Sequence, residues 1–179
     1  MPEIAYRVIR SNRRTLAIQI LPDGTVVVRS PRRMPDEGIR SFVESKADWI
    51  GKHRKTAQPC QKLSPEELHQ LTARASVVIK ERLNRFAPLV GVTYGRVTIR
   101  HQRTRWGSCS ARGNLNFNCL LVLTPPEVLD YVVVHELCHR KELNHSSRFW
   151  AEVERVLPDY TASRKWLKEN GSQLIGRLP

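Results

Sequence analysis

The sequence predicts an α+β protein, with strands in its N-terminal part and helices around a small antiparallel sheet in the rest. Residues 4–30 form short runs of alternating apolar and polar residues separated by turn residues, as half-buried strands do. From residue 36 onward, apolar residues recur three and four positions apart, as in amphipathic helices. The chain has 179 residues, 40% of them hydrophobic, which is enough for one compact domain or for a domain with an N-terminal addition.

The N-terminal part, residues 1–56, is expected to form a β-meander followed by a helix. Turn residues at Ser11-Asn12 and at Pro22-Asp23-Gly24 separate three short runs, which predicts three consecutive antiparallel strands. Apolar residues then fall at helical spacing from Asp36 to about Lys55. Residues 56–63 lack such a pattern and are expected to form a linker.

The second part, residues 64–179, is expected to form the helix-rich core, and the two parts are expected to pack as one compact unit. Its first helix begins with a capping box at Ser64 and Glu67, and Pro88 is expected to end it. The other elements expected are strands over 97–99 and 115–119, a helix over 125–143, a helix that begins at Ser146 or Ser147, and a short last helix that ends near Gly171.

The most informative stretch is His135-Glu136-Leu137-Cys138-His139, within the helix predicted over 125–143. His135 and His139 are four residues apart, so on a helix both rings lie on one face, one turn apart. Two imidazoles at this spacing can reach a tetrahedral Zn²⁺ at about 2.0–2.1 Å. Glu136 follows the first histidine, where its carboxylate can reach a water without binding the metal. The pattern is the HExxH arrangement of zinc hydrolases.

His145 is the candidate third ligand. It follows His139 by six residues, so a helix that ends soon after His139 lets the chain turn back toward the first two rings. Three protein ligands leave a fourth position open, as in catalytic zinc sites. A longer zinc signature has glycine where this chain has Glu142, so Asn144 is the expected left-handed residue of the turn. Glu152, on the following helix, is an alternative third ligand.

Arginine dominates the residues that precede this stretch. The net charge is +13, and no acidic residue lies between Glu81 and Glu127, where seven arginines occur. Arginine binds phosphate in bidentate fashion, so the basic stretch Arg82–Arg112 is a candidate surface for a nucleotide or nucleic acid. The other interpretation is a solvated basic face that only aids solubility.

No segment of the sequence predicts a membrane partner. The longest apolar runs fall short of the 18 residues of a membrane span, and the first residues lack the apolar centre of a signal peptide. The expected location is therefore the cytoplasm. Four cysteines occur without a CxxC pair and are expected to be free thiols, and Cys109 is also a candidate ligand or nucleophile. The four are Cys60, Cys109, Cys119 and Cys138.

Four stretches occur together in a combination typical of one protein family. They are Arg105-Trp106-Gly107-Ser108-Cys109, Gly113-Asn114-Leu115-Asn116-Phe117-Asn118, the HExxH stretch, and Asn144-His145-Ser146-Ser147-Arg148-Phe149-Trp150. With these stretches the chain resembles the YgjP-like family of predicted zinc metallopeptidases, which is similar to SprT-like proteases. The resemblance implies a zincin-like α+β core with one Zn²⁺ per chain, bound by His135, His139 and His145, and Glu136 as the catalytic residue. One family member is linked to nucleoside triphosphate (UTP) pyrophosphatase activity.

Together these patterns predict a zinc-dependent metallopeptidase that acts on peptides or proteins. Glu136 is expected to act as the general base when water attacks a peptide carbonyl, and Tyr160 is a candidate electrophile. The alternatives are a metal-dependent UTP pyrophosphatase and a nucleic-acid-associated protease or binding module. The strand of Asn116 and Asn118 is expected to bind an extended peptide along its edge. The candidate substrate-binding residues are Arg103, Arg105, Trp106, Asn116 and Asn118.

Overall fold

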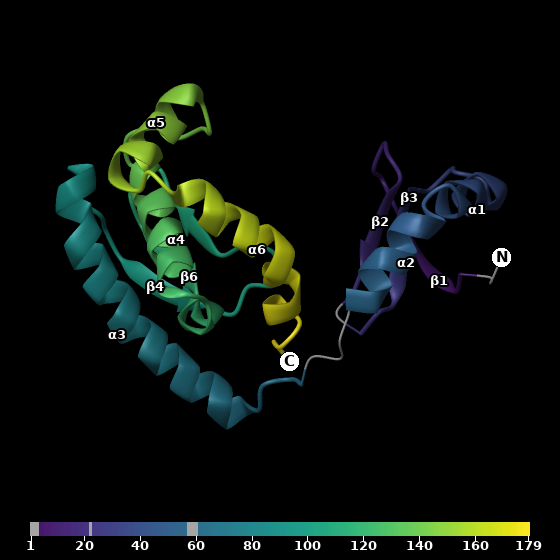
Figure 1. Cartoon of the computed structure of the whole chain (residues 1–179), viewed down its shortest axis with the longest axis horizontal. Coiled ribbons are helices and arrows are strands. Elements are labelled where there is room, and N and C mark those ends of the chain that lie inside the picture. Colours follow the sequence, from purple (N-terminus) through teal and green to yellow (C-terminus); the bar gives the residue numbers. More distant parts are fainter. Residues whose placement is uncertain (1–3, 22, 57–60) are drawn as a thin grey trace. The chain divides into compact units, whose positions relative to one another are not determined.

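The computed structural model contains both helices and small sheets, which confirms the predicted α+β class (Figure 1). It describes residues 4–21, 23–56 and 61–179, so Pro22 of the predicted second turn and Cys60 lie outside the described residues. The chain forms two units, Met1–Gln61 and Lys62–Pro179, and each is described by itself. Close packing of the two parts as one compact unit stays a prediction. Among the described residues, the structure contains no helix that is both long and apolar enough to span a bilayer.

The first unit contains a three-stranded sheet of β1 (Tyr6–Ser11), β2 (Ala17–Ile20) and β3 (Val26–Pro31). The strand order is β1-β3-β2, with β1 parallel and β2 antiparallel to β3, so the predicted antiparallel meander is wrong. Alternation of apolar residues assigns each side chain to a face of a sheet but does not determine which strands are neighbours. The three consecutive valines Val26–Val28 are all buried, which is the pattern of a central strand.

Two short helices cover one face of this sheet, where a single helix was predicted over 36–55. They are α1 (Asp36–Glu44) and α2 (Ala47–Thr56). The break falls at Ser45, whose hydroxyl donates a 2.8 Å hydrogen bond to the carbonyl of Phe42. Such local bonds of serine compete with the helical pattern and favour helix ends. The small core contains Val26, Val28, Ile39, Val43 and Ile50.

The second unit begins with α3 (Pro65–Val90), the longest helix described. Its predicted capping box is present: the Ser64 hydroxyl accepts from the backbone N–H of Glu67, and the Glu67 carboxylate accepts from the N–H of Ser64. Pro88 lies inside the last turn and does not end the helix. The helix ends two residues later at Val90, and its C-cap is Gly91, whose φ of 78° suits glycine.

A second three-stranded sheet follows, made of β4 (Val97–Arg100), β5 (Gly107–Cys109) and β6 (Leu115–Asn118). Its order is β4-β6-β5, with β4 parallel and β5 antiparallel to β6, so the predicted antiparallel sheet is in fact mixed. β5 and β6 form a hairpin through Gly113, which has a φ of 79°. β4 pairs with the other side of β6, so β5 is an edge strand.

The helix α4 (Pro126–Cys138) lies at the centre of this unit. It contacts α3, α5 (Ser147–Val156), α6 (Tyr160–Ile175), β5 and the 3₁₀-helix η1 (Cys119–Leu123). Figure 1 shows α4 running between α3 and α6. Most of its residues are buried, including four consecutive ones from Tyr131 to Val134. The core of the unit is therefore built around the helix that carries the HExxH stretch.

Candidate metal centre

The helix α4 ends where the metal-binding pattern requires a change of direction. Its C-cap is His139, and the next residues close 3₁₀-type bonds, from the N–H of Arg140 to the carbonyl of Leu137 and from that of Lys141 to Cys138. The helix thus ends five residues before the end of the predicted 125–143. Within the described part of the chain only glycines have positive φ, so the predicted left-handed conformation of Asn144 is wrong. Successive turns in ordinary conformations bring the chain back instead.

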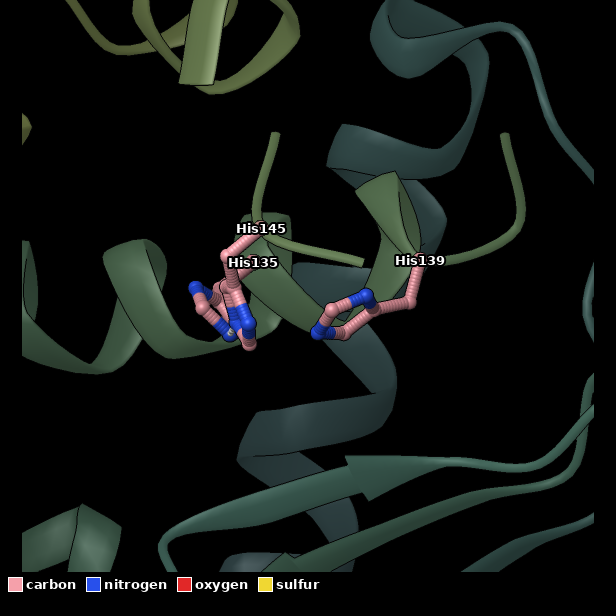
Figure 2. Close-up of side chains that lie close together, drawn as sticks. All are labelled: His135, His139 and His145. Carbon is pink, nitrogen blue, oxygen red and sulfur yellow. Dashed lines mark hydrogen bonds between the residues drawn. The ribbon is translucent and has the colours of Figure 1, made fainter. Parts of the chain in front are cut away.

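The three histidines converge at this turn. The nitrogens of His135, His139 and His145 that could bind one ion lie within 4.8 Å of one another. Figure 2 shows the three rings turned toward one another, two from the end of α4 and one from the following loop. The Nε2 atoms of His135 and His145 are 3.0 Å apart. Ligands of a tetrahedral zinc ion are separated by about 3.3 Å, so these rings fit a divalent metal with small adjustments.

The surroundings of His135 and His139 favour the neutral imidazole, which is the form that binds a metal. Burial, followed by the charges of His139 and His145, lowers the pKa of His135 from 6.5 to about 3. Burial also lowers the pKa of His139. The Nδ1 of His139 lies 3.0 Å from the carbonyl of Glu142, an arrangement that places the proton on Nδ1 and leaves Nε2 free for a metal.

Glu136 is a buried carboxyl group next to this cluster but outside it. The residue is 5% exposed, and its Oε2 is buried without a hydrogen-bond partner. Burial raises the pKa of Glu136 from 4.5 to about 8, against the opposing effect of the Arg105 charge. Gly107 in β5 lies directly against this side chain, since a Cβ atom at Gly107 would lie 2.5 Å from Oε1 of Glu136. A carboxylate without a partner in this position can accept a proton from a water molecule.

Two aromatic side chains, Phe149 and Trp150, pack against the histidines. The ring centroid of Phe149, which is fully buried, lies 4.9 Å from His135, 4.5 Å from His139 and 4.8 Å from His145. Trp150 stacks on His145 at 5.7 Å and 29°. The contacts of these two rings with the histidines were not predicted.

Tyr131 is another neighbour of the site that was not predicted. Its ring lies 5.7 Å from that of His135, and the residue is 6% exposed. Burial raises the pKa of Tyr131 to about 12. The signal was present in the sequence, because Tyr131, His135 and His139 are spaced by four residues and so share one helix face.

Two of the predicted substrate-binding residues lie on the central strand of the sheet. Asn118 is fully buried, and its amide donates to the carbonyls of Gln102 at 2.6 Å and Arg105 at 3.1 Å. Asn116 is half-buried and donates to the Ser108 hydroxyl at 3.2 Å. Because β6 is paired on both sides, the prediction that a peptide binds along its edge is wrong. Asn118 instead fixes the loop before β5.

The other predicted substrate residues are Arg103, Arg105 and Trp106. Arg103 and Arg105 are exposed, and the charge of Arg105 acts on Glu136. Trp106 is half-buried and packs against Gly171 of α6. Tyr160, the candidate electrophile, stacks on Trp150 at 5.4 Å and on Tyr131 at 6.2 Å. These two rings, and not Tyr160, contact His135.

The alternative ligands lie outside the cluster of three histidines. The Glu152 carboxylate is 2.9 Å from Lys141 and 3.0 Å from Arg155, and these bonds lower its pKa. The thiol of Cys109 donates to the carbonyl of Ser110 at 3.4 Å, and burial raises its pKa. Among the described residues, the three histidines are the one group of possible metal ligands that converges.

A search of curated proteins found no match. Among solved structures three chains match. One is a metallopeptidase zymogen of Pyrococcus abyssi, abylysin, with 24% identity, 51% of this chain and 93% of that chain covered, and a TM-score of 0.46. Another is a metallopeptidase zymogen of Methanocaldococcus jannaschii, jannalysin, with 23% identity, coverages of 52% and 94%, and a TM-score of 0.44.

The comparison with protein families extends over both units. Residues 14–73 and 68–170 match the YgjP-like family, which is described as a YgjP-like metallopeptidase domain. The matched residues make up most of the 179 in the chain and include the three histidines, Glu136 and the strand β5. The chain therefore belongs to the YgjP-like family of metallopeptidase domains.

Proposed function

We propose that the protein is a zinc-dependent metallopeptidase with a single zinc ion held by His135, His139 and His145. The observation that carries this proposal is the convergence of three imidazole nitrogens beside the buried, unpartnered carboxyl group of Glu136. Membership of a metallopeptidase family implies a divalent metal and a peptide or protein substrate. Three imidazoles with no carboxylate among them favour zinc over magnesium or calcium, which prefer oxygen ligands.

Glu136 acts as the base and then as the acid in the proposed reaction. Bound zinc acidifies water and polarises a carbonyl oxygen. Glu136 takes a proton from the attacking water, whose oxygen forms a bond to the carbonyl carbon of the peptide. The carbon–nitrogen bond then breaks, and Glu136 delivers the proton to the leaving amine. The Arg105 charge favours the ionised form of the carboxylate that starts this sequence.

The edge strand β5 is the proposed docking strand for the substrate, in place of β6. The carbonyl of Trp106 accepts a hydrogen bond from the backbone N–H of Asn118 at 2.8 Å, and the N–H of Ser110 donates one to the carbonyl of Asn114 at 2.9 Å. In an antiparallel ladder the intervening residues Gly107 and Cys109 direct their backbone groups the other way, toward the free edge. A peptide added along this edge runs beside Glu136, which lies against Gly107.

The geometry of the site does not favour the two alternatives, a UTP pyrophosphatase and a nucleic-acid-associated module. Phosphate chemistry usually recruits magnesium held by carboxylates, and the described residues place no such group of carboxylates at the site. The comparisons give no support to nucleic-acid binding by the Arg82–Arg112 stretch. Both alternatives therefore serve as competing outcomes in the test of the proposed function.

The test compares zinc-loaded wild type with Glu136→Gln on a library of quenched fluorescent peptides and, in parallel, on UTP. We expect peptide cleavage by wild type and a loss of at least about 100-fold in Glu136→Gln, because general base catalysis contributes about that much or more. Bound zinc should be equal in the two proteins. Equal activity of the two proteins, or hydrolysis of UTP with no peptide cleaved, would overturn the proposal.

A further inference from the structure

Arg164 in α6 is an exposed cation fixed beside the candidate metal centre. Its Cζ lies 4.7 Å from the ring centroid of Trp150. The Trp150 centroid is in turn 5.7 Å from that of His145 and 5.9 Å from that of His135. The guanidinium group is therefore separated from the ligand rings by a single aromatic ring.

The position of Arg164 is set by neighbours on its own helix. Tyr160 lies four residues earlier, on the same face of α6, and its ring stacks on Trp150 at 15°. Trp150 is thus held between α6 and the loop that carries His145. A guanidinium on an aromatic face gains a cation–π attraction, so this long side chain loses less freedom when it binds a ligand than an unrestrained arginine does.

The charge of Arg164 is available to a ligand. Among the ion pairs within the described parts of the chain, none includes Arg164. Arg105 supplies a second positive charge near Glu136. The site therefore has cations at its rim and one buried carboxyl group inside.

We propose that Arg164 is a specificity-determining residue that makes this site select peptides with an acidic side chain next to the scissile bond. The inference rests on the proposed peptidase function and deepens it by naming the substrate class. A carboxylate that approaches the metal centre past Trp150 meets the guanidinium, a group that binds carboxylates through paired hydrogen bonds. A neutral or basic side chain at the same place leaves this cation without a partner.

The test uses two peptides that differ only by Glu or Gln beside the bond that is cleaved. We expect wild type to have a kcat/KM about five- to tenfold higher for the Glu peptide, as a partly exposed charged hydrogen bond provides. The Glu-to-Gln ratio should fall to about one in Arg164→Gln, be partly retained in Arg164→Lys, and fall below one in Arg164→Glu. Lys165→Gln, an exposed neighbour on the same helix, is the matched control and should keep the ratio.

A binding measurement separates specificity from catalysis. In the zinc-loaded Glu136→Gln protein, calorimetry should show tighter binding of the Glu peptide than of the Gln peptide, and Arg164→Gln should remove the difference. Equal kcat/KM for the two peptides in wild type, or an unchanged preference in Arg164→Gln, overturns the role of Arg164 and leaves the proposed function standing. If zinc-loaded wild type cleaves neither these peptides nor the library, the proposed function fails and this inference fails with it.

Discussion

Replacement of Gly107 by alanine should displace the carboxylate of Glu136, the proposed base, while leaving the three histidines in place. A Cβ atom at this position would lie 2.5 Å from Oε1, 2.7 Å from Cγ and 2.8 Å from Cδ of Glu136. The closest contact is about 0.9 Å shorter than the 3.4 Å at which ordinary contact begins. Glu136 is 5% exposed, so it has little free space into which to move. Gly107 has no positive φ, so the methyl group, and not backbone strain, causes the effect.

A displacement of nearly 1 Å at a reacting group lowers turnover by about 100-fold. We therefore expect Gly107→Ala to reduce kcat by about this factor with zinc content unchanged. The measurement pairs a peptidase assay with zinc analysis and urea unfolding, in which overpacking should cost about 1–3 kcal/mol. Gly51→Ala is the matched control, because a Cβ there meets nothing within 4 Å. Wild-type kcat in Gly107→Ala would refute the assigned position and role of Glu136.

Three further predictions concern the supports of the site. Phe149→Ala removes a fully buried ring that contacts all three histidines. The free energy of unfolding of the metal-free protein in urea should therefore fall by about 3–5 kcal/mol. A chelator titration should also show weaker zinc binding, and unchanged zinc affinity would contradict this. Asn118→Ala leaves two loop carbonyls without their donor, so the free energy of unfolding in urea should fall by about 1–3 kcal/mol and the urea midpoint should be lower. An unchanged midpoint would show that the loop does not depend on this amide. In the metal-free protein, stability should fall as pH rises from 6.5 to 8, because folded Glu136 keeps its proton up to about pH 8 while the unfolded residue loses it near 4.5. The lowered pKa of His135 changes stability in the opposite direction, but only below pH 6.5. Urea unfolding of Glu136→Gln should therefore show no loss of stability above pH 6.5. A loss of equal size in both proteins would argue against a buried protonated Glu136.

Local sequence patterns predicted the features that depend on nearby residues. The capping box at Ser64 and Glu67 forms as expected, since both partners lie within one helical turn. His135 and His139 converge with His145 because spacing on a helix and a short return loop leave the chain few other routes. The match to the YgjP-like family likewise follows from short stretches at fixed spacing.

Features that depend on distant residues could not be predicted in the same way. Strand order in both sheets follows from which strands meet in space, and alternation along one strand carries no such information. Asn118 was predicted to bind substrate. The partners of its amide, the carbonyls of Gln102 and Arg105, become its neighbours only when β6 pairs with β5. Arg164 reaches the site from the last helix by lying on Trp150, a contact that no sequence spacing indicates.

The central claim is that His135, His139 and His145 together hold one zinc ion, and metal analysis of purified protein tests it most directly. The comparison includes wild type, His145→Ala and Glu136→Gln. We predict about one zinc per chain in wild type and in Glu136→Gln, and a loss of zinc in His145→Ala, because only the histidine supplies a ligand nitrogen. Zinc binding in His145→Ala as tight as in wild type would contradict the three-histidine site.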